Sequence, residues 1–176
     1  MAFTALSSLY YHSDNLVAVL AVFAYCTTLY PGFSRDLYRP GTIKALGKYR
    51  QEIGIASCLL SCIHAGLAIH LSLLHNPPEN FWAAIDAYKT GLIGLAIFLA
   101  LGFTSNRYAQ KKMKKGWKRL HSLTYILPLL LIWHIVAKMT DWSMLTQICF
   151  LLLVSAMSLL ILRLSKRLFP QLVGLK

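Results

Sequence analysis

The chain is dominated by long runs of apolar residues, each close to the length needed to cross a lipid bilayer. A helix that spans about 30 Å of hydrocarbon needs about 20 largely apolar residues. Five segments qualify, at about residues 15–30, 51–74, 88–104, 120–137 and 142–164. No repeat, low-complexity tract or linker divides them. We therefore expect residues 1–176 to form a single domain, an all-α, polytopic transmembrane helix bundle of about five spans.

The composition excludes several other classes of protein. Hydrophobic residues make up 57% of the chain, which is too many for an ordinary soluble domain. The net charge of +12 comes from Lys and Arg in short clusters between the apolar runs, a pattern typical of a membrane protein and not of a nucleic-acid-binding surface. The four cysteines lie inside apolar runs, so we interpret them as small buried hydrophobes. The first dozen residues contain no Lys or Arg, and we expect no cleaved secretory signal.

The positive charges also predict an orientation. Short cytoplasmic loops of membrane proteins hold the excess of Lys and Arg. Sixteen of the 18 lie within residues 35–50, 107–119 and 163–176, which alternate with the remaining loops. Only Lys89 and Lys138 lie on the opposite side. We expect an N-terminus outside and a cytoplasmic C-terminus, in contact with the lipid of a bacterial inner membrane or an equivalent energy-transducing membrane.

Two histidines lie deep inside apolar runs, where a titratable ring is costly unless it is hydrogen-bonded, paired or bound to a metal. His64 lies 14 residues beyond Arg50, and His134 lies 15 residues beyond Arg119. These spacings correspond to about 21 and 22 Å of helical rise, in the outer half of the membrane. Two imidazoles at matched depth on two helices can supply both axial ligands of a haem iron. We interpret His64 and His134 as metal ligands, with hydrogen-bonded core histidines as the alternative.

A second candidate site lies near the cytoplasmic face. His121 follows Arg119 by two residues, and the position at the same depth on the second helix is near Arg50, whose guanidinium cannot bind iron. A straight helix turns His121 about 140° away from His134, although Pro128 between them could bend it. We therefore expect one haem, with Arg50 and His121 available to a propionate, a flavin, a quinol or a weakly ligated second haem.

The other residues near these sites carry weaker signals. The helix face of His64 includes the small residues Ser57, Ser61 and Ala68, which leave room for a flat macrocycle but would also serve tight helix packing. His70 points about 120° away from His64, and we expect it to be an ordinary interfacial residue.

Three patches resemble the ferric reductase-like transmembrane family. The run R-Q-E-I-G at residues 50–54, followed by His64, is similar to that family's R-R-x-L-G and first haem histidine. Thr104-Ser105 resembles its T-S, and W-K-R-L-H at 117–121, with His134 thirteen residues on, resembles its W-x-x-L-H and later histidine. Within the family the likeness is closest to the MsrQ/YedZ-type haem-binding membrane subunit of the bacterial methionine sulfoxide reductase system. Two features depart from the pattern, Gln51 in place of the second arginine and five spans instead of six.

The resemblance implies haem b in a membrane electron-transfer protein. The chain has no G-x-G-x-x-G motif, so electrons would come from a separate donor protein, a quinol or a larger membrane complex and pass to a separate acceptor. We expect an electron-transfer subunit of an oxidoreductase system, with a flavin or quinone at the cytoplasmic side and no nucleic acid. The alternative is an accessory or assembly subunit of a larger membrane complex, with structural haem or none. A transporter is disfavoured, because Glu52 is the only acidic residue that we expect near a helix interior.

Overall fold

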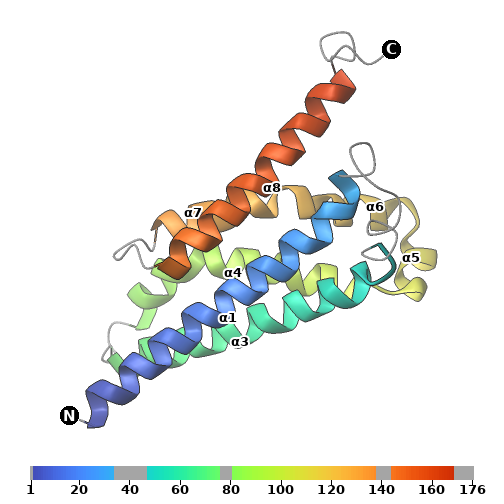
Figure 1. The fold of residues 1–176 in the computed structure, drawn as a ribbon. Helices are drawn as coiled ribbons and strands as arrows, with labels where there is room; N and C mark the ends of the chain where they lie inside the picture. The colour runs from blue at the N-terminus through green and yellow to red at the C-terminus, as the bar shows by residue number, and fades with distance from the viewer. Residues whose placement is uncertain (1, 34–46, 76–80, 138–143, 169–176) are drawn as a thin grey trace.

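The computed structural model describes residues 2–33, 47–75, 81–137 and 144–168, and these are built from helices (Figure 1). The elements are α1 (Ala2–Phe33), α3 (Arg50–His75), α4 (Phe81–Thr104), α5 (Arg107–Met113), α6 (Lys115–Ser122), the 3₁₀ helix η3 (Leu123–Tyr125), α7 (Leu127–Ala137) and α8 (Met144–Leu168). The predicted all-α fold is confirmed for these ranges.

Three of the described helical segments are long and apolar enough to cross a membrane on their own. They are Ser13–Tyr30, Arg50–Leu74 and Lys115–Ala137. A fourth candidate is Tyr88–Thr104, taken together with Arg107–Met113, from which it is bent by 96°. The apolar part of α8, Met144–Ser158, is shorter. The described residues thus give three or four candidate spans by length and composition, and the predicted total of about five stays a prediction.

Helix α1 is longer than the apolar run that predicted it. The sequence placed its start near Asn15, but the helix already includes Ala2. The segment before Asn15 is rich in Ala, Leu, Ser and Tyr and contains neither Gly nor Pro, so nothing in it breaks a helix. As a consequence, Asp14 lies within a helix.

Five helices form a closed ring in which each packs against two others. Helix α1 contacts α3 and α8, α4 contacts α3 and α7, and α7 contacts α8. Short helices α5 and α6 lie together at the end of the bundle opposite the N-terminus (Figure 1). The first and last helices of the chain are therefore neighbours, and the ring has an interior lined by all five.

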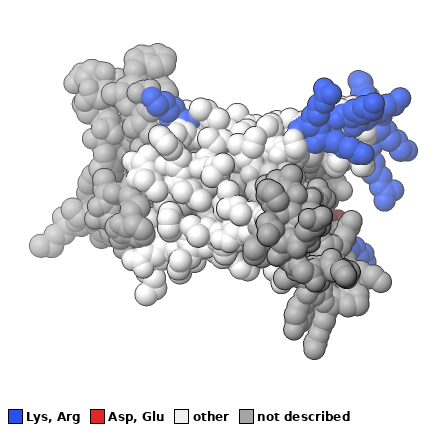
Figure 2. All heavy atoms as spheres, turned by 90° about the horizontal axis from the view of Figure 1, so that it is seen from above, with Lys and Arg blue, Asp and Glu red and all other residues white. Residues whose placement is uncertain are grey.

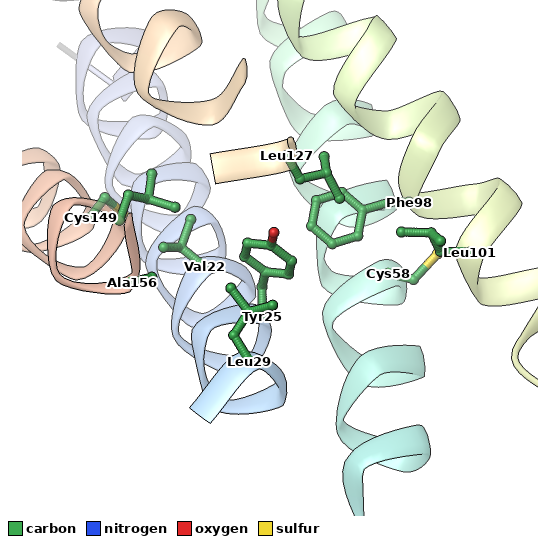
Figure 3. Packing of buried hydrophobic residues seen from close by; sticks show 10 residues of the cluster. Val22, Tyr25, Leu29, Cys58, Phe98, Leu101, Leu127, Cys149 and Ala156 are labelled. Carbon is green, nitrogen blue, oxygen red and sulfur yellow. The ribbon is translucent and has the colours of Figure 1, made fainter. Parts of the chain in front are cut away.

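Apolar side chains fill part of that interior (Figure 3). Tyr25 of α1 and Phe98 of α4 meet edge to face, with ring centroids 5.3 Å apart. Leu127, at the start of α7, is fully buried beside them. Burial of these large side chains supplies the main attraction between helices inside the ring, because dispersion contacts are densest there.

Small residues let α3 approach its two neighbours closely. The hydroxyl of Ser57 is fully buried and donates a hydrogen bond to the carbonyl of Ala21 on α1, at 2.9 Å. A β-carbon on Gly102 of α4 would lie 3.0 Å from Sγ of Cys58, so a larger residue there would press on the Cys58 side chain. Ser57 thus serves helix packing, one of the two roles that the sequence left open for this face, and Cys58 is buried as expected.

Positive charge gathers at the α5–α6 end of the bundle. Figure 2 shows most of the visible Lys and Arg atoms at one end and a largely uncharged surface along the middle. The exposed cations of α5 and α6 and the residue between them are Arg107, Lys111, Lys112, Lys114, Lys115, Lys118 and Arg119. Large apolar residues of the bundle, such as Leu59, Phe103 and Leu129, are exposed, as in a bundle whose outer face meets lipid.

Candidate cofactor site

His64 of α3 is held by a carboxylate from α1. Its Nδ1 lies 2.7 Å from Oδ1 of Asp14, and the two side chains are 29% and 13% exposed. An ionised carboxylate can only accept hydrogen bonds, so this contact places the imidazole proton on Nδ1. The lone pair is then on Nε2, the nitrogen that a metal would use.

His134 of α7 is held by α4. Its Nδ1 lies 3.1 Å from the hydroxyl oxygen of Thr90. The next residue, Gly91, leaves space for the ring, because a β-carbon there would be only 2.7 Å from Cε1 of His134. The imidazole thus rests directly against the α4 backbone, and its Nδ1, like that of His64, lies within hydrogen-bond distance of a side-chain oxygen.

His64 and His134 occupy similar positions relative to the buried core. His64 follows Ser57 by seven residues, and His134 follows Leu127 by seven. Ser57 and Leu127 are both fully buried, and seven residues bring a helix back to within about 20° of the same face. Each histidine therefore lies two turns beyond a buried residue, on the face with which its helix packs into the ring.

The depths of the two histidines agree only approximately. Cys58 lies opposite Gly102, and His134 lies opposite Gly91, eleven residues away on α4. At about 1.5 Å per residue, His64 is about 9 Å and His134 about 16 Å from the Cys58–Gly102 contact. His134 is thus about 7 Å farther from the α5–α6 end, little more than one helical turn. The predicted placement of both histidines in the outer half of the membrane stays a prediction.

His121 belongs to a separate cluster at the α5–α6 end. Its Nε2 lies 3.2 Å from the hydroxyl oxygen of Thr104, and its ring stacks on Trp117 with centroids 4.1 Å apart and planes inclined by 26°. The indole N–H of Trp117 donates to the carbonyl of Thr104 at 2.9 Å. These contacts fasten α6 to the last residue of α4.

The start of α3 completes this cluster. Arg50 is exposed, and its positive charge acts on the His121 imidazole. The side-chain amide of Gln51 donates to the carbonyl of Ser105, just beyond the end of α4. Arg50 and His121, expected at the same depth on separate helices, are thus close enough to interact electrostatically.

Both histidines of the α6–α7 segment reach the same neighbouring helix. Thr104 and Thr90 are fourteen residues apart on α4, about four turns, so they lie on nearly one face. The segment is therefore not the straight helix for which a 140° divergence was expected, and the alternative left open, a bend at Pro128, agrees with this arrangement. The helix is interrupted by η3 and then by Pro128, which is fully buried, and this interruption resets the direction of His134 relative to His121.

Sequence reasoning missed the partners of the proposed ligands. Glu52 was expected to be the only acidic residue near a helix interior, and the position of Asp14 within α1 corrects that expectation. An available signal was the absence of any helix breaker before Asn15. Thr90 and Gly91 were not identified as candidate site residues. Both lie at the start of the apolar run of α4, the helix that packs between α3 and α7.

The donor set fits haem b. Among the described residues, no three His, Cys, Asp or Glu side chains gather into a cluster that could hold a bare metal ion. A haem iron needs only two axial ligands from the protein, because the porphyrin supplies its other four nitrogens. Two imidazoles, each engaged at Nδ1 by a side-chain oxygen, are suited to that role. His70 is exposed on the surface of α3, and its interfacial position stays a prediction.

Comparison with known proteins places this arrangement in a family. The chain is similar to magnetosome protein MamZ of Magnetospirillum gryphiswaldense, with 37% identity over 100 residues. It is also similar to magnetosome protein MamZ of Paramagnetospirillum magneticum, with 32% identity over 100 residues. Each match covers 53% of this chain but only 15% of the relative. No solved structure matches. Residues 15–132 match the ferric reductase like transmembrane component, and the chain therefore belongs to that family of membrane proteins.

Proposed function

We propose that this chain holds one haem b between His64 and His134 and passes electrons through the membrane from a separate donor to a separate acceptor. The family indicates a membrane redox role. The observation that carries the proposal is the placement of the two histidines. They lie on α3 and α7, on either side of α4, each two turns beyond a fully buried residue and each engaged at Nδ1.

The haem would supply a reversible one-electron step between ferric and ferrous iron. His64 and His134 would bind it through Nε2, while Asp14 and Thr90 hold the two rings at Nδ1 and fix their directions. The packed side chains of Tyr25, Phe98 and Leu127 close the interior toward the α5–α6 end, so water from that side is kept away from the site.

The cluster at the α5–α6 end is the proposed point of contact with the electron donor. Thr90 and Thr104, which hold the two histidines of the α6–α7 segment, are about 21 Å apart along α4. Arg50 offers a positive charge, and Trp117 and His121 offer a stacked aromatic pair. These groups suit a propionate, a flavin or a quinol, and the surrounding cations favour an anionic partner.

The relatives favour a protein that works with others. The curated magnetosome proteins contain a matching segment as 15% of their length, so most of each relative lies outside the likeness. This chain lacks the G-x-G-x-x-G motif of a dinucleotide domain. We therefore propose that it acts as the membrane module of an oxidoreductase system, with a donor and an acceptor separate from this helix bundle.

A visible spectrum of the purified protein, before and after dithionite, tests the proposal. Paired Soret and alpha bands that sharpen on reduction are expected for low-spin haem b. His64→Ala and His134→Ala should each abolish the low-spin spectrum, because one imidazole cannot fill both axial positions. A folded, fully assembled protein without colour would instead support the accessory role.

His70→Ala is the matched control for these variants. His70 lies one and two-thirds turns beyond His64 on the same helix but is exposed. Its replacement should leave haem content and spectrum nearly unchanged. Normal haem content and spectrum in folded His64→Ala would show that the assigned pair of ligands is wrong.

A further inference from the structure

Asp14 is an acidic residue in an apolar helix, and its surroundings make it unusual. It lies within the segment Ser13–Tyr30, which is apolar and long enough to span a membrane. Its side chain is only 13% exposed. A carboxylate in such a place is costly and persists only with a partner, and here the partner is His64 on the neighbouring helix, at 2.7 Å.

The Nδ1 atom of His64 has a charged partner. His64 contacts a carboxylate, whereas the Nδ1 contact of His134 is with the neutral hydroxyl of Thr90. A carboxylate that accepts a proton from Nδ1 increases the electron density on the imidazole and makes Nε2 a stronger donor. A hydroxyl has a much smaller effect, because it carries no net charge.

We propose that Asp14 is a positioning residue that holds His64 in its metal-binding tautomer and keeps the reduction potential of the bound iron low. This inference rests on the proposed function. Ferric iron carries one more positive charge than ferrous iron, so a nearby negative charge stabilises the oxidised state. The Asp14–His64 contact would thereby make the reduced haem a stronger electron donor to its acceptor.

The test is a redox titration of purified, haem-loaded protein with Asp14→Asn, followed optically. The substitution keeps the shape of the side chain and removes its charge. We expect the equilibrium constant for reduction to rise by about tenfold, equivalent to 59 mV for a one-electron couple. The g values of the ferric low-spin signal in electron paramagnetic resonance should also shift, because a weaker imidazole donor changes the ligand field.

Glu52→Gln is the control for net charge. Glu52 is exposed in the first turn of α3, on the same helix as His64 but twelve residues away. Its replacement removes one negative charge without touching the histidine, so the potential and the g values should stay as in the unmodified protein. A shift equal to that of Asp14→Asn would show a general charge effect and overturn the inference.

Asp14→Glu covers the case in which Asp14→Asn loses haem. A longer side chain with the same charge should restore haem content and the low potential. Loss of haem in both variants would overturn the inference, because the site would then require the shape of Asp14 and not its charge. An unchanged potential and signal in haem-loaded Asp14→Asn would overturn it too. Absence of haem from the unmodified, folded protein would instead overturn the proposed function.

Discussion

The hydroxyl of Tyr25 on α1 donates a hydrogen bond to the backbone carbonyl of Thr124 in η3. In an uninterrupted helix this carbonyl would accept the N–H of residue 128, but residue 128 is proline, which has none. Tyr25 is only 2% exposed, so its hydroxyl also needs a partner inside the bundle. The Tyr25 hydroxyl and the Thr124 carbonyl therefore satisfy each other's hydrogen bonding. A tyrosine on α1 thus replaces the hydrogen bond that Pro128 removes from the α6–α7 segment.

Tyr25→Phe should destabilise the bundle by about 1 kcal/mol, the scale of a hydrogen bond between membrane helices. The loss should be much smaller in a Pro128→Ala background, because residue 128 can then donate its own N–H to Thr124. Unfolding of the four proteins in mixed detergent, analysed as a double-mutant cycle, measures this coupling. Equal losses of stability in both backgrounds would show that the Tyr25 hydroxyl does not stand in for the N–H that Pro128 lacks.

Gly91 is the position on α4 where a side chain would most directly disturb the candidate site. A β-carbon there would lie 2.7 Å from Cε1 and 3.1 Å from Nδ1 of His134. Gly91→Ala must therefore displace the imidazole or push α7 away from α4. We expect a marked fall in haem content, measured per protein by the pyridine haemochrome spectrum.

Gly66→Ala provides the comparison, because a β-carbon on Gly66 would meet nothing within 4 Å. Both substitutions replace glycine in a helix, which by itself favours helix formation by about 1 kcal/mol. Gly66→Ala should keep normal haem content. If Gly91→Ala kept it as well, His134 would not depend on its contact with α4 in the haem-bound protein.

The fold could be predicted largely because its elements follow from apolar runs between clusters of charge. The bounds of α3 agree with the predicted residues 51–74 to within one residue at each end, since Arg50 and the pair Pro77-Pro78 flank the run. The start of α1 was missed because a hydropathy run ends at a charged residue, whereas a helix does not have to. Asp14 stays in the helix because His64 accommodates its charge.

The sequence indicated the histidines of the candidate site but not the residues that contact them. Depth counting along single helices identified His64 and His134, because a buried imidazole is conspicuous in an apolar run. Thr90 and Gly91 matter only once α4 lies beside α7, and no pattern within one helix indicates that neighbour. The direction of His134 was left open for a related reason, since the sequence marks Pro128 as a possible bend but does not give the size of that bend.

The orientation of the protein in the membrane is still a prediction. Cysteines introduced at Lys112 and Glu79, after replacement of the four native cysteines by alanine, should be labelled from opposite sides by an impermeant reagent. Lys112 is exposed among the cations of α5, and Glu79 lies outside the described residues. We expect Glu79→Cys to react from outside and Lys112→Cys only after the membrane is opened, because cation-rich loops stay in the cytoplasm. Labelling of Lys112→Cys in intact cells would show that the protein has the opposite orientation.

The number of haems distinguishes two roles for His121. Its Nε2 contacts the hydroxyl of Thr104, and its ring stacks on Trp117, so the imidazole already fastens α6 to α4. Across from it, at the start of α3, is Arg50, which remains protonated and cannot bind iron. We therefore expect one haem per chain, retained in His121→Ala.

The same variant should slow reduction from the cytoplasmic side, because it removes half of the aromatic pair next to the proposed donor contact. Stopped-flow reduction by a soluble flavin donor measures this rate, and dithionite reduction of the haem serves as the control, since a small reductant does not need the contact. Trp117→Leu should have a similar effect, because it removes the other half of the stack. A ratio near two haems per chain, falling to one in His121→Ala, would show instead that His121 is a ligand and that a further residue provides its axial partner.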